Sequence, residues 1–225
     1  MIGFQVRKRQ RKVSDKFVAA FAEIPVANVS DCMWRMTAGG PRLRPMHDGS
    51  RMGGAAITVK TRPGDNLMIH KALDVAEPGD VVVVDGGGDL TTALIGELMS
   101  TYAMSRKLGG LVINGAIRDV DIIRAASFPV YAAGVTHRGP YKDGPGEINV
   151  PIAIDGMVIE PGDLIIGDAD GFLCVPFAEC ETVLAASQKK LAAEQQTLKN
   201  IAAGTHDTSW VDERLKQLGC DPAAR

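Results

Sequence analysis

The chain has 225 residues, and 45% of them are hydrophobic, which is enough apolar material for one domain with a sizeable core. It carries 25 basic and 27 acidic residues, and the net charge of -2 gives no electrostatic footprint for a nucleic acid or an anionic membrane surface. No stretch approaches the roughly 20 apolar residues of a membrane-spanning helix, and no apolar run follows the basic N-terminal segment. We therefore expect a soluble, cytoplasmic protein that binds neither nucleic acid nor membrane.

The N-terminal part of the sequence predicts helices. VSDKFVAAFAEI (13–24) has a helical pattern, and Asn28 or Ser30 is suited to begin a second helix that continues into CMWRM (32–36). Glycine and proline then become frequent, which indicates that the helical part ends there.

The middle of the sequence alternates apolar strands with helices. The runs DVVVVDG and GLVINGA are apolar without alternation, as is typical of strands that are buried on both faces of a sheet. Strand and helix in regular alternation predict a βαβαβ unit with parallel pairing. The expected strands are 55–61, 80–86, 110–116 and 129–135, and the expected helices between them are 66–76, 95–110 and 119–127.

After Gly139 the sequence changes to short apolar runs that are joined by Asp-Gly and Pro-Gly turns, which predicts β-hairpins. A long helix is expected at about 177–203. Two stretches, 76–89 and 159–172, resemble each other through the shared motif Glu-Pro-Gly-Asp. They are either an internal duplication or convergent turns, and the second interpretation is favoured because Pro-Gly turns before strands are common.

The common cofactor motifs are absent. The glycine-rich segment 86–88 follows a strand, but Thr91 stands where a dinucleotide loop needs its last glycine, and no P-loop occurs. GDADG (167–171) lacks the length and closing glutamate of a calcium loop and fits a hairpin turn better. Scattered histidines and cysteines without a C-x-x-C motif argue against zinc, iron and disulfides. The cysteines are Cys32, Cys174, Cys180 and Cys220.

Arg118 and Asp119 stand where the apolar strand 110–116 has just ended. Neighbours in sequence do not face each other on a helix, so we do not expect a simple local ion pair. In a parallel sheet this position lies at the edge where α/β folds bind ligands, and Glu97 at the start of the preceding helix emerges at the same edge. Both acids also have a structural interpretation, Asp119 as a helix cap and Glu97 as a first-turn acid favoured by the helix dipole.

Three segments together carry a resemblance to a known family. GGGDLTTALIGELMSTYAMSRKLGGLVINGAIRDVD, HRGPYKDGPGEINVPI and PGDLIIGDADGFLCVP are similar to the RraA-like family, over about residues 25–205. This family contains class II 4-hydroxy-4-methyl-2-oxoglutarate/4-carboxy-4-hydroxy-2-oxoadipate aldolases and regulators of ribonuclease E activity. The resemblance implies an α/β layered sandwich of the swivelling-domain type. It also implies homotrimers or homohexamers with sites between subunits.

For the domain organisation, we expect one RraA-like domain over 1–225. Its core covers about 25–176, and a C-terminal helical extension covers about 177–225. The central βαβαβ part, the β-hairpins, and the helical N- and C-terminal segments all belong to this α/β domain.

The resemblance also implies roles for individual residues. The aldolase motif is an acid, twenty intervening residues and Arg-Asp, which Glu97, the segment 98–117 and Arg118-Asp119 fit; the acid is often aspartate, so glutamate is a departure. Asp119 is then the direct ligand of Mg²⁺ or Mn²⁺, Glu97 holds metal-bound water, and Arg118 binds the substrate or its enolate. The regulators lose part of this set. The implied substrate-binding residues are Gly96, Glu97, Leu98, Met99 and Arg118.

The predicted C-terminal helix contributes one more candidate. Leu184, Leu191 and Leu198 repeat every seven residues, and Glu194 lies on the same apolar face. From spacing alone Glu194 either flanks this stripe or reaches a polar site on a neighbour. The resemblance implies the second role, a water-mediated metal contact in the adjacent subunit. Asn114, Gly86–Gly88 and the segment 136–142 are further candidates for the pocket wall, without an assigned role.

The implied function is a metal-dependent aldolase that cleaves 4-hydroxy-2-oxo acids, releases pyruvate and also decarboxylates oxaloacetate. The alternative is a non-catalytic protein that regulates ribonuclease E by binding it. All three motif residues are present, which favours the enzyme.

Overall fold

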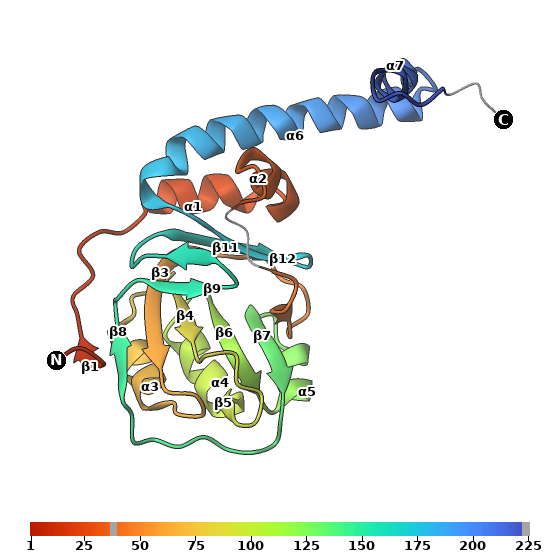
Figure 1. The fold of residues 1–225 in the computed structure, drawn as a ribbon. Helices are drawn as coiled ribbons and strands as arrows, with labels where there is room; N and C mark the ends of the chain where they lie inside the picture. The colour runs from red at the N-terminus through yellow and green to blue at the C-terminus, as the bar shows by residue number, and fades with distance from the viewer. Residues whose placement is uncertain (37–39, 222–225) are drawn as a thin grey trace. The chain divides into compact units, whose positions relative to one another are not determined.

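The computed structural model describes residues 1–36 and 40–221, and the chain separates into two compact units, Met1–Ser187 and Gln188–Arg225. The first unit is built on a ten-stranded sheet (Figure 1). Its main path runs in the order β1-β8-β3-β4-β6-β7-β2, and β5, β11 and β12 pair outside this path.

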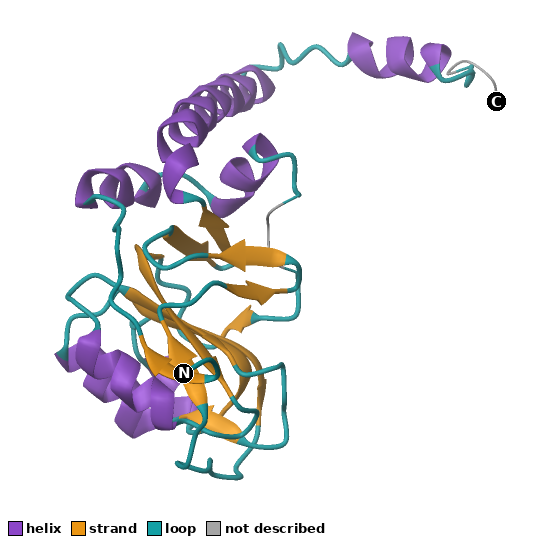
Figure 2. Ribbon diagram, turned by 60° about the vertical axis from the view of Figure 1, so that its left-hand side comes forward, coloured by secondary structure: helices purple, strands orange, loops and turns teal. Residues whose placement is uncertain are grey.

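The centre of the sheet is the predicted parallel unit. β3 pairs with β4, β4 with β6, and β6 with β7, all in parallel, and a helix connects each pair. These three helices gather on one face of the sheet (Figure 2). The elements are β3 (Met52–Thr61), α3 (Leu67–Val75), β4 (Val81–Asp85), β5 (Ala93–Ile95), α4 (Glu97–Ser105), β6 (Gly110–Ile117), α5 (Val120–Ala125) and β7 (Val130–Val135).

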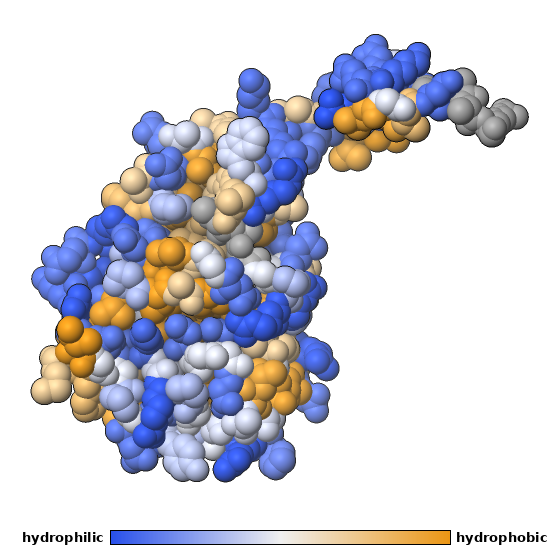
Figure 3. All heavy atoms as spheres, in the orientation of Figure 1, coloured by the Kyte–Doolittle hydropathy of each residue, from blue (hydrophilic) through white to orange (hydrophobic). Residues whose placement is uncertain are grey.

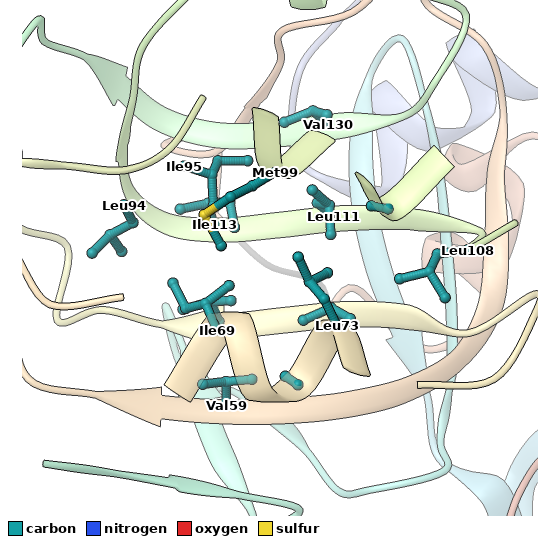
Figure 4. Close-up of a cluster of buried hydrophobic side chains, with 14 of the residues drawn as sticks. Val59, Ile69, Leu73, Leu94, Ile95, Met99, Leu108, Leu111, Ile113 and Val130 are labelled. Atoms are coloured by element: carbon teal, nitrogen blue, oxygen red, sulfur yellow. The ribbon is translucent and has the colours of Figure 1, made fainter. Parts of the chain in front are cut away.

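The main hydrophobic core lies between this face and the three helices. It joins Leu111 and Ile113, which alternate along β6, with Ile69 and Leu73 of α3 (Figure 4). All residues of β6 are buried, which explains why its sequence is apolar without alternation. Each fully buried leucine or isoleucine contributes about 1.5–3 kcal/mol, so this core fixes the positions of the helix starts.

The β-hairpins that the sequence predicted after Gly139 are present. Their strands pair antiparallel, and β11 also pairs antiparallel with β3, which joins the hairpin part to the parallel part. GDADG forms the turn of the second hairpin, as expected. The elements are β8 (Gly146–Ile148), β9 (Ile152–Ile154), β10 (Met157–Ile159), β11 (Leu164–Asp168) and β12 (Gly171–Val175); β1 (Phe4–Val6) and β2 (Arg44–Pro45) are short edge strands.

The N-terminal helices are α1 (Asp15–Ala22) and α2 (Val26–Cys32). The prediction that the second helix begins at Asn28 or Ser30 and continues through 32–36 was wrong. It begins at Val26, whose N–H donates to Oδ2 of Asp168 at 2.9 Å, a long-range contact that the local sequence does not show. It ends because Trp34 and Arg35 have positive φ angles.

The helix expected at 95–110 was also placed too early. Ala93–Ile95 forms β5, which pairs in parallel with the end of β6, and α4 begins only at Glu97. Ile95 therefore belongs to a strand, because the end of β6 offers it a partner that the local pattern does not indicate.

The C-terminal helices are α6 (Cys180–Ala202), which follows a short 3-10 turn at Phe177–Glu179, and α7 (Ser209–Gln217). In the second unit, none of residues 188–221 is buried. Among the described helices, none is both long and apolar enough to cross a bilayer.

Candidate functional site

The Arg118-Asp119 pair lies directly after the last residue of β6. β5 pairs with the end of β6, and the backbone N–H of Arg118 donates to the carbonyl oxygen of Ile95 at 3.0 Å. Gly96 and Glu97 follow at the start of α4. The starts of α4 and α5 therefore meet at the carboxyl edge of the parallel strands, which is the edge where open α/β sheets bind ligands.

Asp119 does not act as an ordinary side-chain cap of its own helix. Its backbone is left-handed, with φ 57° and ψ 37°, and its side chain makes no capping hydrogen bond to α5. Instead, its Oδ2 accepts a hydrogen bond from the backbone N–H of Glu97 at 2.9 Å. A left-handed residue other than glycine costs about 1–3 kcal/mol, and such residues are concentrated at functional sites. This geometry favours the functional interpretation of Asp119 over the capping one.

Arg118 lies against the carboxylate of Asp119. The distance from Arg118 Nε to Asp119 Oδ2 is 3.8 Å, and the two side chains are 44% and 39% exposed. The expectation that these neighbours do not form a local ion pair was wrong. It assumed helical geometry, whereas the left-handed backbone at Asp119 turns its carboxylate back toward the arginine.

Two glycines make room for this pair. A Cβ atom on Gly96 would lie 2.3 Å from Asp119 Oδ2 and 2.9 Å from Arg118 Cγ. A Cβ atom on Gly139 would lie 3.1 Å from Arg118 Nη1. Gly96 is therefore required by close approach of the site side chains rather than by its own backbone angles.

Backbone donors at the start of α4 complete one side of the site. Among the described residues, the N–H groups of Leu98 and Met99 have no hydrogen-bond acceptor, whereas the N–H of Glu97 is used by Asp119. The first N–H groups of a helix carry partial positive charge and bind anions well. Leu98 and Met99 can therefore hold a substrate carboxylate.

A pocket of about 110 Å³ brings these groups together. Residues from the starts of α3, α4 and α5 and from the loop between β7 and β8 line it: Asn66, His70, Leu94, Ile95, Gly96, Leu98, Met99, Arg118, Asp119, Pro140 and Lys142. A second hollow of about 520 Å³ is lined by the same pair together with residues of α5 and the end of β7. Arg118 and Asp119 therefore line two solvent-accessible spaces.

The pocket contains residues that sequence reasoning missed. Asn66 and His70 follow β3, so the rule that placed Arg118 at the carboxyl edge of the sheet would also have placed them there. Lys142 comes from the segment 136–142, which the sequence analysis offered as a candidate for the pocket wall without an assigned role. Asn114 and Gly86–Gly88 are not among the residues that line this pocket. The side-chain amide of Asn114 donates to Asp85 Oδ1 at 2.9 Å.

The oxygen donors of the site suit a hard divalent cation. Oδ1 of Asp119 has no hydrogen-bond donor among the described residues, although the carboxylate is partly buried. Within residues 1–36 and 40–221, no group of three or more His, Cys, Asp or Glu side chains could hold a metal by itself. Mg²⁺ keeps several waters and needs only one or two protein carboxylates, so the donor set fits Mg²⁺ or Mn²⁺ better than a zinc cage.

Glu194 belongs to the second unit and is described by itself. It lies on α6, and its carboxylate pairs with Lys190 Nζ at 2.9 Å, one helical turn earlier. It is 48% exposed, so the carboxylate remains accessible to a further ligand. Its predicted part in a site on another subunit stays a prediction.

Comparison with known proteins identifies the family. The family model of RraA-like proteins, described as Aldolase/RraA, matches residues 26–174. A protein of Halalkalibacterium halodurans, named as a provisional 4-hydroxy-4-methyl-2-oxoglutarate aldolase, is 39% identical over 83% of this chain and 89% of its own length.

Solved structures agree with this match. An uncharacterized protein from Pseudomonas syringae pv. tomato has the same fold, with a TM-score of 0.77, 24% identity, and coverage of 86% of this chain and 95% of that one. The RNA-processing inhibitor RraA from Thermus thermophilis superposes with a TM-score of 0.63 at 30% identity, over 68% of this chain and 93% of that one. The predicted fold class is thereby confirmed, and the chain belongs to the RraA-like family.

Proposed function

We propose that the protein is a divalent-metal-dependent aldolase that cleaves 4-hydroxy-2-oxo acids of the 4-hydroxy-4-methyl-2-oxoglutarate type and releases pyruvate. The observation that carries this proposal is the strained Asp119, whose carboxylate is turned into a pocket beside Arg118 and the start of α4. The name of the Halalkalibacterium halodurans relative supports the same activity.

The chain's own residues fit the charges that such a reaction handles. In the retro-aldol step the C3–C4 bond breaks, the hydroxyl proton leaves, and the electron pair moves to the C2 oxygen as an enolate. The N–H groups of Leu98 and Met99 would hold the substrate carboxylate, and the guanidinium of Arg118 would donate to the enolate oxygen. Arg118 suits this task because its planar fork of donors matches adjacent oxygens, which a lysine ammonium does not.

Asp119 would hold the metal directly and Glu97 would hold it through water. When bound, a divalent cation supplies Lewis acidity that stabilises negative charge on the keto oxygen. Because decarboxylation of oxaloacetate passes through the same enolate of pyruvate, we also expect oxaloacetate decarboxylase activity.

Glu194 would complete the site from a neighbouring subunit of a homotrimer or homohexamer. This proposal is supported by the second unit, which exposes apolar residues without burying any of its described ones. Closed rings permit such sharing, because every chain both gives and receives the same contact.

The alternative function is a non-catalytic regulator that binds ribonuclease E. It is supported by the similarity to the Thermus RNA-processing inhibitor. The complete Glu97, Arg118 and Asp119 set, gathered at one edge of the sheet, favours the enzyme, because binding a ribonuclease does not require a pocket that contains a left-handed acid.

Metal removal tests the two functions against each other. We expect pyruvate release from oxaloacetate and from 4-hydroxy-2-oxo acids to stop in EDTA and to return with Mg²⁺ or Mn²⁺, because the proposed metal-holding residues, Asp119 and Glu97, offer hard oxygen ligands. Lactate dehydrogenase and NADH would report the pyruvate. Full activity in the chelator would contradict the metal dependence, and inactivity toward every oxo acid with every metal would favour the regulator.

A further inference from the structure

Two parts of the chain supply walls of the pocket. One is the end of β5 with the first turn of α4, whose N–H groups are the proposed donors to the substrate carboxylate. The other is the loop between β7 and β8, residues 136–145, which contributes Pro140 and Lys142. Both walls contact one short segment, Asp65-Asn66, which directly precedes α3.

Asp65 holds the loop between β7 and β8. Its Oδ2 accepts the N–H of Asp143 at 2.8 Å and the N–H of Gly144 at 2.9 Å. Neither N–H has another acceptor among the described residues. Two backbone hydrogen bonds of Tyr141, at 2.8 and 3.0 Å, fasten the same stretch to the residues on either side of Asp65. The loop is therefore fixed over residues 141–144.

The carboxylate of Asp65 stays ionised although its side chain is fully buried. Burial raises its pKa, but hydrogen bonds from three backbone N–H groups and the charge of Arg62 outweigh burial, so the net pKa is lowered. The two oxygens have different partners. Oδ1 accepts the N–H of Leu67 at 3.0 Å, within the turn that leads into α3, and Oδ2 accepts the donors of the loop.

Asn66 holds the other wall. Its side chain is buried, and Nδ2 donates to the carbonyl oxygen of Leu94 in β5 at 2.9 Å. The same Nδ2 lies 3.3 Å from Sδ of Met99 in the first turn of α4. Two consecutive residues thus join the loop to the start of α4, although these parts are far apart in the sequence.

We propose that Asp65 is a positioning residue of this pocket, whose carboxylate fixes the loop between β7 and β8 relative to the first turn of α4. Asp65 does not line the pocket, so it acts through the loop and not on a ligand. The inference rests on the proposed function and adds a residue to its site. A wall that is already ordered costs less free energy when a substrate binds than a mobile wall that binding must order.

Hydrogen exchange of the full-length protein tests the hold on the loop. In Asp65→Asn, the amide oxygen can keep the bond to Leu67, but an NH₂ group replaces the oxygen that accepts from Asp143 and Gly144. We expect the amides of residues 141–144 to exchange at least about 10-fold faster, and those of β6 to exchange as in the wild type. Unchanged exchange of the loop would overturn the proposal.

Asp80→Asn is the matched control. Asp80 is also a fully buried aspartate that pairs with an arginine and accepts a backbone N–H, but it does not line the pocket or contact the loop. Both variants should lower the free energy of unfolding in urea, whereas only Asp65→Asn should release the loop. If Asp65→Asn does not fold, Asp65→Ser replaces it, because a serine hydroxyl can still accept the N–H of Leu67 but is too short to hold the loop.

Kinetics distinguish positioning from stability alone. With oxaloacetate and Mg²⁺, at a temperature where both variants are fully folded, Asp65→Asn should lower kcat/KM by about 10-fold, mainly through KM, because binding must then order the wall. Asp80→Asn should leave kcat and KM unchanged. An unchanged KM in Asp65→Asn, or equal losses in the two variants, would overturn the positioning role. If the wild type releases pyruvate from no oxo acid, the proposed function fails, whereas hydrogen exchange still decides whether Asp65 fixes the pocket wall.

Discussion

At the scale of single residues, the position of Asp119 was predictable from the sequence but its role was not. The pattern of strands and helices placed it correctly at the carboxyl edge of the sheet, but did not distinguish a helix cap from a site residue. The choice depends on a left-handed backbone and on a hydrogen bond to Glu97, which is 22 positions away. Neither feature has a local sequence signal, because aspartate is common in both settings. The segment 136–142, which contains Lys142, was a candidate for the pocket wall, but its contact with the start of α3 is a long-range feature that only the folded chain shows.

Substitution of the pair separates two roles. Asp119→Ala should abolish metal-dependent turnover, because it removes the direct ligand. Arg118→Lys should still bind metal but lose at least about 10²-fold in kcat, the usual scale for one lost donor to a developing oxyanion. Metal binding by calorimetry and steady-state kinetics measure the two effects. A wild-type rate in Arg118→Lys would contradict the role of its planar fork of donors.

At the scale of elements, the two Glu-Pro-Gly-Asp stretches form the same structure. In each, the aspartate accepts the N–H of the glutamate three residues earlier, Asp80 from Glu77 at 2.8 Å and Asp163 from Glu160 at 2.9 Å. Each turn precedes a strand that pairs with β3, β4 in one case and β11 in the other. The resemblance in sequence therefore reflects a shared turn before neighbouring strands.

Each of these turns is bound by one arginine of the N-terminal basic segment. Arg9 contacts Glu77 and Asp80 at 3.0 and 2.9 Å, and Arg11 contacts the corresponding pair in the second turn. Composition alone did not show that this basic segment forms ion pairs within the chain. Arg9 and Arg11 are two residues apart, a spacing that suits an extended segment that passes two adjacent turns.

Removal of Arg9 should destabilise the fold. Its side chain is 10% exposed and that of Asp80 is fully buried, so Arg9→Ala would leave a buried carboxylate that keeps the N–H of Glu77 but has Lys12 as its one remaining ion-pair partner among the described residues. We expect a loss of about 2–3 kcal/mol, below the usual 3–5 kcal/mol for a broken buried pair because Lys12 remains. Urea unfolding would measure it. Lys8→Ala, an exposed substitution in the same segment, should change the free energy of unfolding by less than about 0.5 kcal/mol. An equally small effect of Arg9→Ala would show that the contacts of Arg9 with Glu77 and Asp80 contribute little to stability.

At the scale of the whole molecule, the second unit has exposed apolar side chains that a partner chain could cover. Its apolar side chains, including Leu198, Ile201, Trp210 and Leu218, are exposed. An isolated helix as short as α7, with nine residues, is marginal in water without a packed face. The family resemblance implies that this partner is a second copy of the chain. The helical extension was predicted from the sequence. The molecule that covers it was not, because the periodicity of apolar residues identifies the apolar face of a helix but not what packs against that face.

Mixing of two inactive variants tests a shared site. Asp119→Ala and Glu194→Ala proteins should each be nearly inactive alone, and after joint dissociation and reassembly in equal amounts activity should return. With random mixing, about half of the sites have an intact Asp119 and half of those an intact Glu194, so about a quarter are complete. No recovery would indicate a site within one chain, and a fully active Glu194→Ala protein would show that Glu194 only flanks the helix stripe.

The central claim is carbon–carbon cleavage of an oxo acid, and its products give the most direct test. Retro-aldol cleavage of 4-hydroxy-4-methyl-2-oxoglutarate converts both halves of the molecule into pyruvate. Purified protein with Mg²⁺ should therefore release two molecules of pyruvate for each molecule of substrate consumed, as measured by nuclear magnetic resonance of the complete reaction, and Asp119→Ala should release none. Unchanged substrate after long incubation with the wild-type protein and Mg²⁺ would contradict the account.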